Sequence, residues 1–451
     1  MSNATITLKY DVDDRPPLRA AIPLGLQHVL VMMASNVSLP LVLASAVGMT
    51  TTESAFLVQV ALLVAGITTL VQTLGVWRIG SRLPIVQGTS SGFLIVAIPL
   101  AQNHGVAAVF GGAIFAGCVQ MALGFSLTWL NRFFPAVVSG VVMLVIGIGL
   151  IPVGIGLFGG GTKSPDFGSL QNLGVGALVT VVILIAYRYG RGVLNAASVL
   201  VGLIVGYGVA AALGMIDFSP VGEAAWFSIP RPFEFGISLP AAALVSMGVM
   251  AIATAVETIG HLTALTKGAA GRDITDRELE GGVVADGFST AFASVFSALP
   301  NTTFAQNVGL VTLTGVMSRF VVTIGGVILI VLGLFPKLAT VIAVMPPAVI
   351  GGAAVVMFGM VFATGVKLIS DAALDRHDLL VIAVSVGLGQ GFAMSDGLVA
   401  HLPTLLGDLL ASGLVPAVFL SVVMNLLRPK TAEGGFIFEV DPPEVEKETS
   451  A

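Results

Sequence analysis

The sequence has 451 residues, of which 56% are hydrophobic and only 10% are charged, with a formal net charge of -5 at pH 7. Because a soluble domain carries about a quarter charged residues, this composition excludes an ordinary globular protein. Nearly charge-free apolar stretches, each long enough to cross a bilayer as a helix of about 20 residues, recur from about residue 20 to residue 427. We therefore expect an all-α polytopic membrane protein embedded in a lipid bilayer.

The apolar stretches predict about fourteen membrane-spanning segments. In chain order they lie at about 20–45, 54–75, 86–100, 106–130, 135–158, 170–187, 194–214, 239–265, 281–298, 304–316, 317–336, 342–364, 378–394 and 404–427. Residues 1–17 are polar and contain no short apolar segment with a cleavage site, so the first span is expected to be a permanent anchor. The single cysteine, Cys118, excludes an internal disulfide and a cysteine-based metal cluster.

The positions of Lys and Arg predict the orientation of the chain. An even number of spans places both termini on one side, and with that side cytoplasmic 17 of the 20 Lys and Arg residues fall in cytoplasmic segments. Only Lys163, Arg231 and Lys337 fall outside. We expect an inner- or plasma-membrane protein with cytoplasmic tails at 1–19 and 428–451.

The longest external loop, at 215–238, separates two sets of seven spans, a first repeat at 20–214 and a second at 239–427. Two halves with an odd number of spans are inverted relative to each other, as in many transporters. The third and tenth spans occupy matching places, and both are short and interrupted by Gly or Pro, at residues 83–92 and 300–309. Such a pair of segments indicates a binding site near the middle of the membrane.

Ionisable residues inside spans need a reason, because each costs several kcal/mol in hydrocarbon. Glu257 lies near the middle of the eighth span, and His261 lies one helical turn later on the same face. This pair can hold a proton or accept a ligand N–H, or it can brace two helices. Asp286 begins the ninth span and either ties the helix end to a neighbour or takes part in proton movement.

Two further groups of polar residues lie at the starts of spans. Gln27 and His28 open the apolar part of the first span, where an interhelical hydrogen bond is the alternative to a functional role. Gln306 and Asn307 begin the short tenth span, where a helix N-terminus presents unpaired N–H groups. With Glu257 they would match the edge of a flat heterocycle that bears alternating N–H and C=O groups; otherwise they cap a helix break. His104, His377 and His401 fall in predicted loops and are expected to be solvated.

Residues 306–315, QNVGLVTLTG, resemble the signature of the nucleobase–ascorbate transporter family, Gln/Glu-Asn-x-Gly-x4-Thr-Gly/Arg/Lys. The Gln27-His28 pair resembles the family's Gln-His pair in the first span. Residues 257–261, ETIGH, resemble its Glu-x-x-Gly-His/Asp segment, and residues 285–287, ADG, its Ala-Asp-Gly in the ninth span. The resemblance extends over about residues 15–427.

The resemblance implies a core domain of spans one to four and eight to eleven, and a gate domain of spans five to seven and twelve to fourteen. It implies short antiparallel strands before the third and tenth helices. Glu257 and Gln306 would hold the nucleobase, with backbone groups of Ala305 and Ser91 beside them. By the same resemblance His261, Asp286, Asn307, His28 and Gln27 are supporting or proton-linked positions.

The sequence departs from the family at the third span. Many members have an aromatic residue after Gly-Thr-Ser or Gly-Ser-Ser that stacks on the base, whereas here Ser91 follows and Phe93 comes two residues later. Either Phe93 takes over the stacking or the pocket is roomier and the selectivity differs.

The resemblance implies proton-coupled uptake of a nucleobase by an elevator-type motion, with xanthine or uric acid favoured by Gln306. A carboxamide can donate to a purine C=O or bare nitrogen, whereas a carboxylate can only accept. The alternatives are a uracil or other pyrimidine symporter, coupling to sodium, and an anion exchanger or channel of the same architecture. We expect no enzyme activity, cofactor, metal site or nucleic-acid partner, and a homodimer formed through the gate domains.

Overall fold

The computed structural model describes residues 8–126, 135–372, 374–395, 397–399 and 401–428, so the expected C-terminal tail lies almost entirely outside the described residues. The elements of the first half are α1 (Leu18–Val47), α2 (Thr51–Leu74), β1 (Gln87–Thr89), α3 (Leu94–His104), α4 (Val106–Gly124), α6 (Ala136–Phe158), α7 (Leu170–Tyr189), α8 (Val193–Ala196), α9 (Ser198–Ala212) and α10 (Ser219–Glu223). Those of the second half are α11 (Ala241–Leu265), the π-helix η1 (Thr266–Ala270), α12 (Asp276–Val295), β2 (Asn301–Thr303), α13 (Ala305–Thr314), α14 (Arg319–Gly333), α15 (Pro336–Ala343), α16 (Pro347–Ser370), α17 (Arg376–Ala393), α18 (Thr404–Ala411) and α19 (Leu414–Leu426).

The helices are those of a multi-pass membrane protein. Among the described residues, seven helices are long and apolar enough to cross a membrane, or up to nine if each of two bent pairs is one span. The bends are 83° between α14 and α15 and 81° between α18 and α19. The stretch expected as one span at 404–427 is therefore two helices, joined at Gly413, whose φ of 65° favours glycine. α15 begins at Pro336, a residue suited to the first turn of a helix.

Polar residues at the helix ends explain several element boundaries. The hydroxyl of Thr50 caps α2 and the side chain of Glu53 bonds back to the N-cap backbone. Thr275 and Glu278 form the same reciprocal pair at the start of α12. Each pair satisfies backbone N–H groups that the first turn of a helix leaves unpaired.

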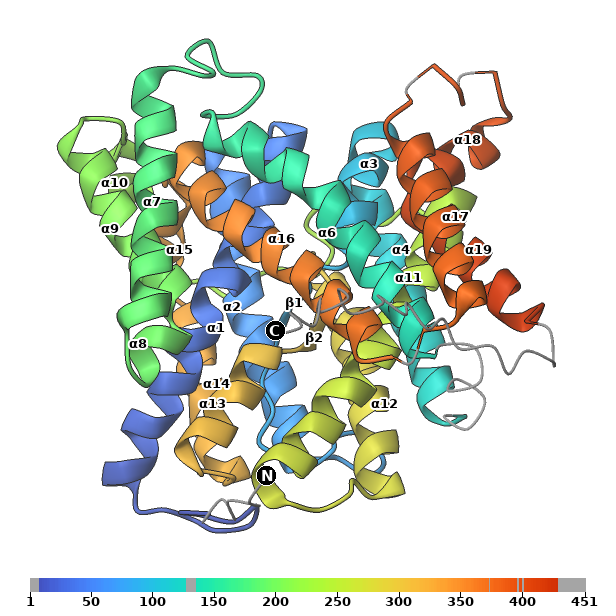
Figure 1. Cartoon of the computed structure of the whole chain (residues 1–451). Helices are drawn as coiled ribbons and strands as arrows, with labels where there is room; N and C mark the ends of the chain where they lie inside the picture. Colours follow the sequence, from blue (N-terminus) through green and yellow to red (C-terminus); the bar gives the residue numbers. More distant parts are fainter. Residues whose placement is uncertain (1–7, 127–134, 373, 396, 400, 429–451) are drawn as a thin grey trace, which may run out of the picture.

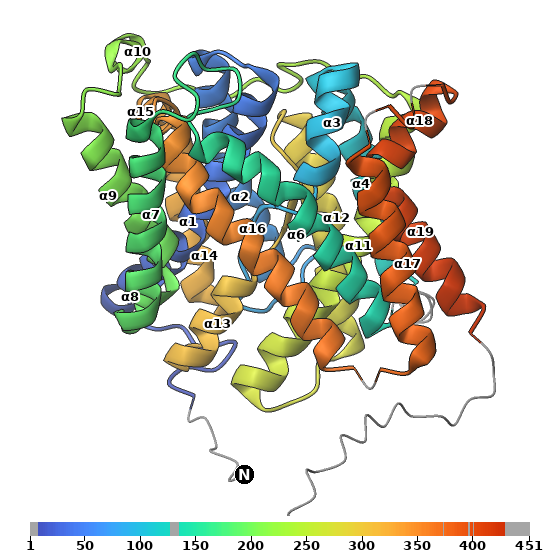
Figure 2. The ribbon, with the colours of Figure 1, turned by 45° about the horizontal axis from the view of Figure 1, so that its top comes forward.

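The helices pack as a set around α1–α4 and α11–α14, with α6 and α16 crossing in front of it. α2 packs on α14, α4 packs on α11 and α12, and α6 packs on α16. Figure 1 shows α6 and α16 side by side, with α7 to α9 on one side of this pair and α17 to α19 on the other. The 45° rotation in Figure 2 keeps this arrangement.

Several helix pairs approach each other backbone to backbone through glycines, among them α2 with α14 and α4 with α12. A Cβ atom on Gly66 of α2 would lie 2.6 Å from the carbonyl oxygen of Gly326 on α14. A Cβ atom on Gly117 of α4 would lie 2.5 Å from the carbonyl oxygen of Gly287 on α12. Only glycine permits either contact, which is a common way for helices to associate in a membrane.

Two three-residue strands meet in the interior of the fold. β1 and β2 are antiparallel, with Gln87 opposite Thr303 and Gly88 opposite Thr302. α3 follows β1 and α13 follows β2, and in both views these half-length helices lead away from the strands toward opposite ends of the molecule. The N-termini of both half-helices therefore lie near the strand pair.

The described part of the N-terminal segment is held against the loop after α13. The Lys9 N–H donates to the carbonyl of Gly315 at 2.8 Å, and the Met317 N–H donates to the carbonyl of Tyr10 at 2.9 Å. Arg319 forms an ion pair with Asp13 at 2.7 Å. Residues 9–13 thus form part of the packed structure rather than a separate tail.

Candidate functional site

The outer backbone groups of the two strands are satisfied by side chains of α2 and α12. The Gln87 N–H donates to the Thr69 hydroxyl at 3.0 Å. The Thr290 hydroxyl donates to the carbonyl of Asn301 at 2.8 Å. Non-helical backbone at membrane depth needs such partners, because no water is present to replace them. The helices therefore hold the strands in a defined position.

Glu257 and His261 lie together on α11, and His261 connects them to β2. The His261 Nε2 is 3.9 Å from a carboxylate oxygen of Glu257, and both side chains are partly exposed, at 18% and 25% respectively. The His261 Nδ1 forms a hydrogen bond of 2.8 Å with the hydroxyl of Thr303. The imidazole is thus placed between the acid and the strand that leads into α13.

Asp286 lies apart from solvent at the junction of α4, α11, α12 and β2. Its side chain is fully buried, and one oxygen, Oδ2, accepts three hydrogen bonds. The donors are the Gln120 amide at 2.5 Å, the Thr258 hydroxyl at 2.9 Å and the Thr302 hydroxyl at 3.2 Å. Asp286 therefore links three helices to the strand.

The start of α13 presents two exposed residues followed by a buried one. Ala305 and Gln306 are exposed, whereas Asn307 is buried. The Asn307 amide donates to the carbonyl of His28 on α1 at 3.0 Å, and it lies 3.0 Å from the His28 ring. Gln306 comes three residues after Thr303, the residue that binds His261, and α11 packs against both β2 and α13. These contacts bring the helix of Glu257 alongside the segment that carries Gln306.

Ser91 and Gln27 are both partly buried. Ser91 lies between β1 and α3, and its carbonyl accepts from the N–H of Leu94 at 3.1 Å. It therefore belongs to the turn that starts the half-helix α3. Gln27 precedes His28 on α1.

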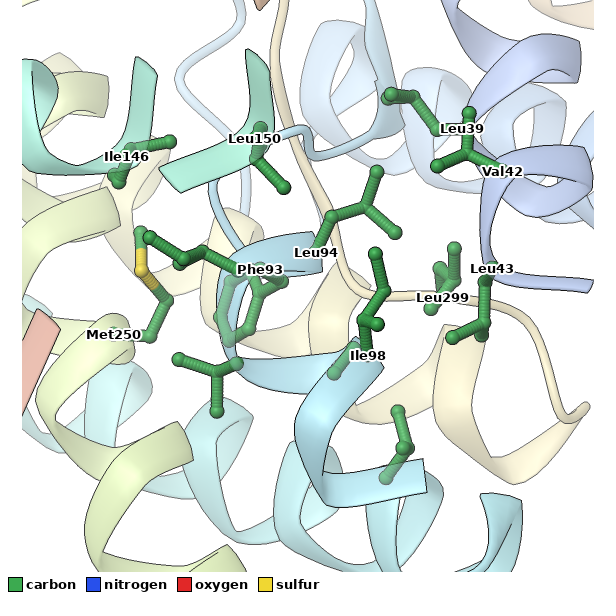
Figure 3. Packing of buried hydrophobic residues seen from close by; sticks show 14 of the residues in the cluster. Leu39, Val42, Leu43, Phe93, Leu94, Ile98, Ile146, Leu150, Met250 and Leu299 are labelled. Atoms are coloured by element: carbon green, nitrogen blue, oxygen red, sulfur yellow. The ribbon is translucent and has the colours of Figure 1, made fainter. Parts of the chain in front are cut away.

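Phe93 is fully buried in this conformation. It belongs to the largest hydrophobic cluster, together with Leu94, Ile146 and Met250. Figure 3 shows Phe93 among these side chains. Its role as the stacking aromatic stays a prediction, and it requires that the ring become uncovered when a ligand binds.

A cavity lies between α3 and helices α6, α17 and α18, and Leu94, the neighbour of Phe93, forms part of its wall. Its lining includes Ile95, Ile98, Gly149, Gln390 and Ser412, and it does not include Glu257 or Gln306. Because its walls are mostly apolar, it offers less to a polar heterocycle than the strand junction does. We therefore place the candidate site at the strands.

His104 does not lie in a solvated loop as the sequence suggested. It ends α3, and its Nε2 lies 2.7 Å from a carboxylate oxygen of Asp408 on α18. Asn103 donates to the other oxygen at 3.3 Å. His377 also has a partner, the carbonyl of Met424 at 2.8 Å. Both histidines therefore take part in tertiary contacts.

Sequence reasoning missed several polar side chains that hold the site. Asn36 of α1 accepts from the Thr89 N–H at 2.9 Å, Gln120 and Thr258 bind Asp286, and Thr303 binds His261. An amide inside an apolar helix, as at Asn36 and Gln120, is itself a signal, because such groups seek partners in a membrane. Their partners depend on tertiary packing, which the sequence pattern does not contain.

A profile of the Permease family matches residues 19–397, which is most of the chain. The chain belongs to the nucleobase–ascorbate transporter family. This confirms the resemblance drawn from the signature at residues 306–315. Members of this family are permeases, so the chain is a transporter and not an enzyme.

Characterised members of the nucleobase–ascorbate transporter family are similar over nearly their whole length. The uric acid permease PucJ of Bacillus subtilis is 38% identical over 410 residues, covering 89% of this chain and 91% of the relative. The xanthine permease of the same organism is 37% identical over 408 residues, covering 90% of this chain and 93% of the relative.

Among solved structures, the murine Slc26a9 anion transporter in the inward-facing state has the same fold. The TM-score is 0.62 at 14% sequence identity, and the match covers 93% of this chain and 70% of that chain. At this identity the likeness concerns the fold alone.

Proposed function

We propose that this transporter takes up a purine nucleobase, xanthine or uric acid, together with a proton, and that Glu257 and Gln306 bind the base. The hydrogen bond between His261 and Thr303 carries the proposal. It joins the helix of Glu257 to the strand that leads, within three residues, to Gln306. The names of the relatives, a uric acid permease and a xanthine permease, support a purine.

The chemistry of the two side chains suits a purine dione or trione. The Glu257 carboxylate accepts ring N–H groups, and the Gln306 carboxamide both donates and accepts. The backbone at Ala305 and Ser91 adds groups at the N-termini of α13 and α3, where N–H groups are unpaired. These groups bind the edge of the base, and the ring of Phe93 stacks on its face if the ring becomes exposed.

The other polar residues have supporting or coupling roles in this proposal. Glu257 takes up the proton or shares it with the base and His261. Asp286 fixes the strand, and Asn307 with His28 fixes the start of α13. A proton crossing with the base adds a driving force of about 2.3 kcal/mol per charge per 100 mV of membrane potential. A sodium ion would gain the same, so we favour proton coupling for another reason: Glu257 and His261, which lie side by side, are both groups that can bind and release a proton.

We propose fourteen spans in two inverted repeats, with a core built from α1–α4 and α11–α14 and a gate built from the remaining long helices. The packing supports the two repeats, because exchanging the two helices of a packed pair for their counterparts in the other half gives another packed pair. The α2–α14 pair becomes the α12–α4 pair, and the α7–α9 pair becomes the α17–α19 pair. Short β1 and β2 then belong to the third and tenth spans.

The site moves across the membrane, in this proposal, when the core slides against the gate as in an elevator. The paired helices α6 and α16 form the surface against which the core moves, and the gate helices join two copies into a dimer. The protein lies in the cell membrane with both termini in the cytoplasm, as the distribution of Lys and Arg indicates.

A uracil transporter of the same family is the second candidate for the cargo, and Gln306 in place of Glu favours the purine. An anion exchanger or channel would share the fold. Anion carriers tend to place a basic residue at the start of the tenth span, and residues 300–316 contain no Lys or Arg. The family membership likewise favours a nucleobase.

Uptake of labelled xanthine, urate and uracil by a transport-deficient cell tests the proposal. Cells that express the protein should accumulate xanthine or urate above the vector control, and a proton uncoupler should abolish the accumulation. Accumulation that survives the uncoupler but needs sodium would overturn the proton coupling. Accumulation of uracil alone would overturn the purine assignment, and uptake of none of the three would overturn the function.

A further inference from the structure

Gln120 is the closest partner of Asp286, although it comes from a helix with no assigned role in the site. It lies on α4, it is fully buried, and its amide nitrogen is 2.5 Å from Asp286 Oδ2. The contact follows from the glycine crossing of α4 and α12. Gln120 comes one turn after Gly117, and Asp286 comes directly before Gly287, the two residues whose backbones touch.

A second glycine crossing in the fold carries apolar residues at the two positions that correspond to Asp286 and Gln120. α2 and α14 cross at Gly66 and Gly326 in the same close manner. The residue directly before Gly66 is Ala65, and the residue three positions after Gly326 is Leu329. Both are buried and apolar.

A neighbouring contact shows that the two crossings correspond. Thr69 comes three residues after Gly66 and binds the backbone of β1. Thr290 comes three residues after Gly287 and binds the backbone of β2. Because Ala65 and Leu329 fill the places of Asp286 and Gln120 at the equivalent crossing, the helix packing itself does not require an acid and an amide.

The Gln120–Asp286 contact is instead continuous with the candidate site. The Oδ2 atom of Asp286, to which Gln120 donates, also accepts hydrogen bonds from the hydroxyls of Thr302 in β2 and Thr258 in α11. Thr303, next in β2, binds His261. The position of the carboxyl group thus sets the position of β2 relative to α11.

We propose that Gln120 is a positioning residue for transport. Its amide fixes the Asp286 carboxyl group, and through β2 it sets the geometry of Glu257 and His261 without touching the ligand. The inference rests on the proposed function, because its effect is read in the kinetics of nucleobase uptake.

The variant Gln120→Met keeps the size of the side chain and removes the donor. The matched control is Gln59→Met, because Gln59 is also a buried amide donor but binds Ser228, in the long loop before α11. A hydrogen bond to a carboxylate contributes more free energy than one between neutral groups. Loss of the Gln120–Asp286 hydrogen bond should therefore lower Vmax/KM for xanthine about tenfold or more. We expect the loss to lie mainly in KM, at unchanged membrane abundance, while the control stays within about twofold of the wild type.

The variant Gln120→Glu provides a readout that a packing role would not change. Two facing carboxyl groups can form a hydrogen bond only when one carries a proton. On the elements packed against α12, the ionisable residues are Glu257 and His261 of α11, the exposed Cys118 of α4 and Glu53 at the start of α2, and both strands are neutral. Uptake by Gln120→Glu, divided by wild-type uptake at each pH, should therefore recover as the assay is acidified, whereas Gln120→Met should not recover.

An unchanged KM in Gln120→Met would overturn the inference, as would a Gln120→Glu variant whose relative uptake does not respond to pH. If Gln120→Met is not found in the membrane, Gln120→Glu alone decides. Failure of the proposed function can be told apart from failure of this inference, because in the first case the wild type itself would take up none of the three nucleobases.

Discussion

The ring of His261 lies between Thr303 and Glu257, at 2.8 Å from the hydroxyl of the strand residue and 3.9 Å from the carboxylate. A shift of β2 is therefore transmitted to the imidazole, and a change in charge on Glu257 acts on the same ring. One side chain, His261, therefore contacts both the acid that is proposed to carry the proton and the strand that leads to Gln306.

Replacing Glu257 by Gln should abolish or uncouple accumulation of the labelled purine, because the amide cannot hold or release the proton. Membrane abundance should remain that of the wild type. The control is Glu53→Gln, an acid that caps α2 far from the strands. Accumulation at the wild-type level in Glu257→Gln would refute the proton role.

Replacing Thr303 by Val should lower Vmax/KM about three- to tenfold, because the hydrogen bond to His261 is lost while the shape is kept. Thr312→Val is the matched variant, since the Thr312 hydroxyl donates to the carbonyl of Val308 in its own helix. Initial rates of uptake at several xanthine concentrations measure the effect. Equal losses in both variants would show that Thr303 has no special connection to the site.

Replacing Gln306 by Glu should shift preference from purine toward uracil, because the carboxylate loses the ability to donate. Competition of unlabelled uracil against labelled xanthine measures the change. The neighbouring Asn307 is unsuitable as a control, since it holds α13 to His28. Selectivity that remains unchanged would count against the position of Gln306 in the pocket.

The contact between His104 and Asp408 joins the half-helix α3 to α18, the short helix that leads into α19 of the proposed gate. If the core slides against the gate, this contact must open in each cycle. A Cys118→Ser protein with His104→Cys and Asp408→Cys should lose uptake when a short, reducible bifunctional thiol reagent joins the two cysteines, and should regain it on reduction. Uptake by a variant with either cysteine alone should not change on treatment with the same reagent. Full uptake by the cross-linked protein would exclude a relative motion of α3 and α18.

The sequence predicted the long helices well, because apolar length is what a bilayer demands. It did not predict the bends, since a hydropathy pattern gives the length of an apolar run and not its direction. The run at 404–427 shows this, because α18 and α19 meet there at 81°. Glu257 and His261 could be paired from their spacing within one helix.

The contacts between distant parts of the chain could not be predicted. Gln120 and Asp286 are 166 residues apart, and only the glycine crossing of α4 and α12 brings them together. Phe93 illustrates the reverse case, because its place in the sequence suggested an aromatic face for the base whereas the structure buries it completely. Whether it becomes uncovered depends on the movement of the surrounding cluster.

A structure of the protein with xanthine bound tests the central claim most directly. The base should lie at the strand pair, with its edge within hydrogen-bonding distance of both Glu257 and Gln306. A base bound instead in the cavity between α3 and α6, or one that contacts neither of these side chains, would contradict the assignment.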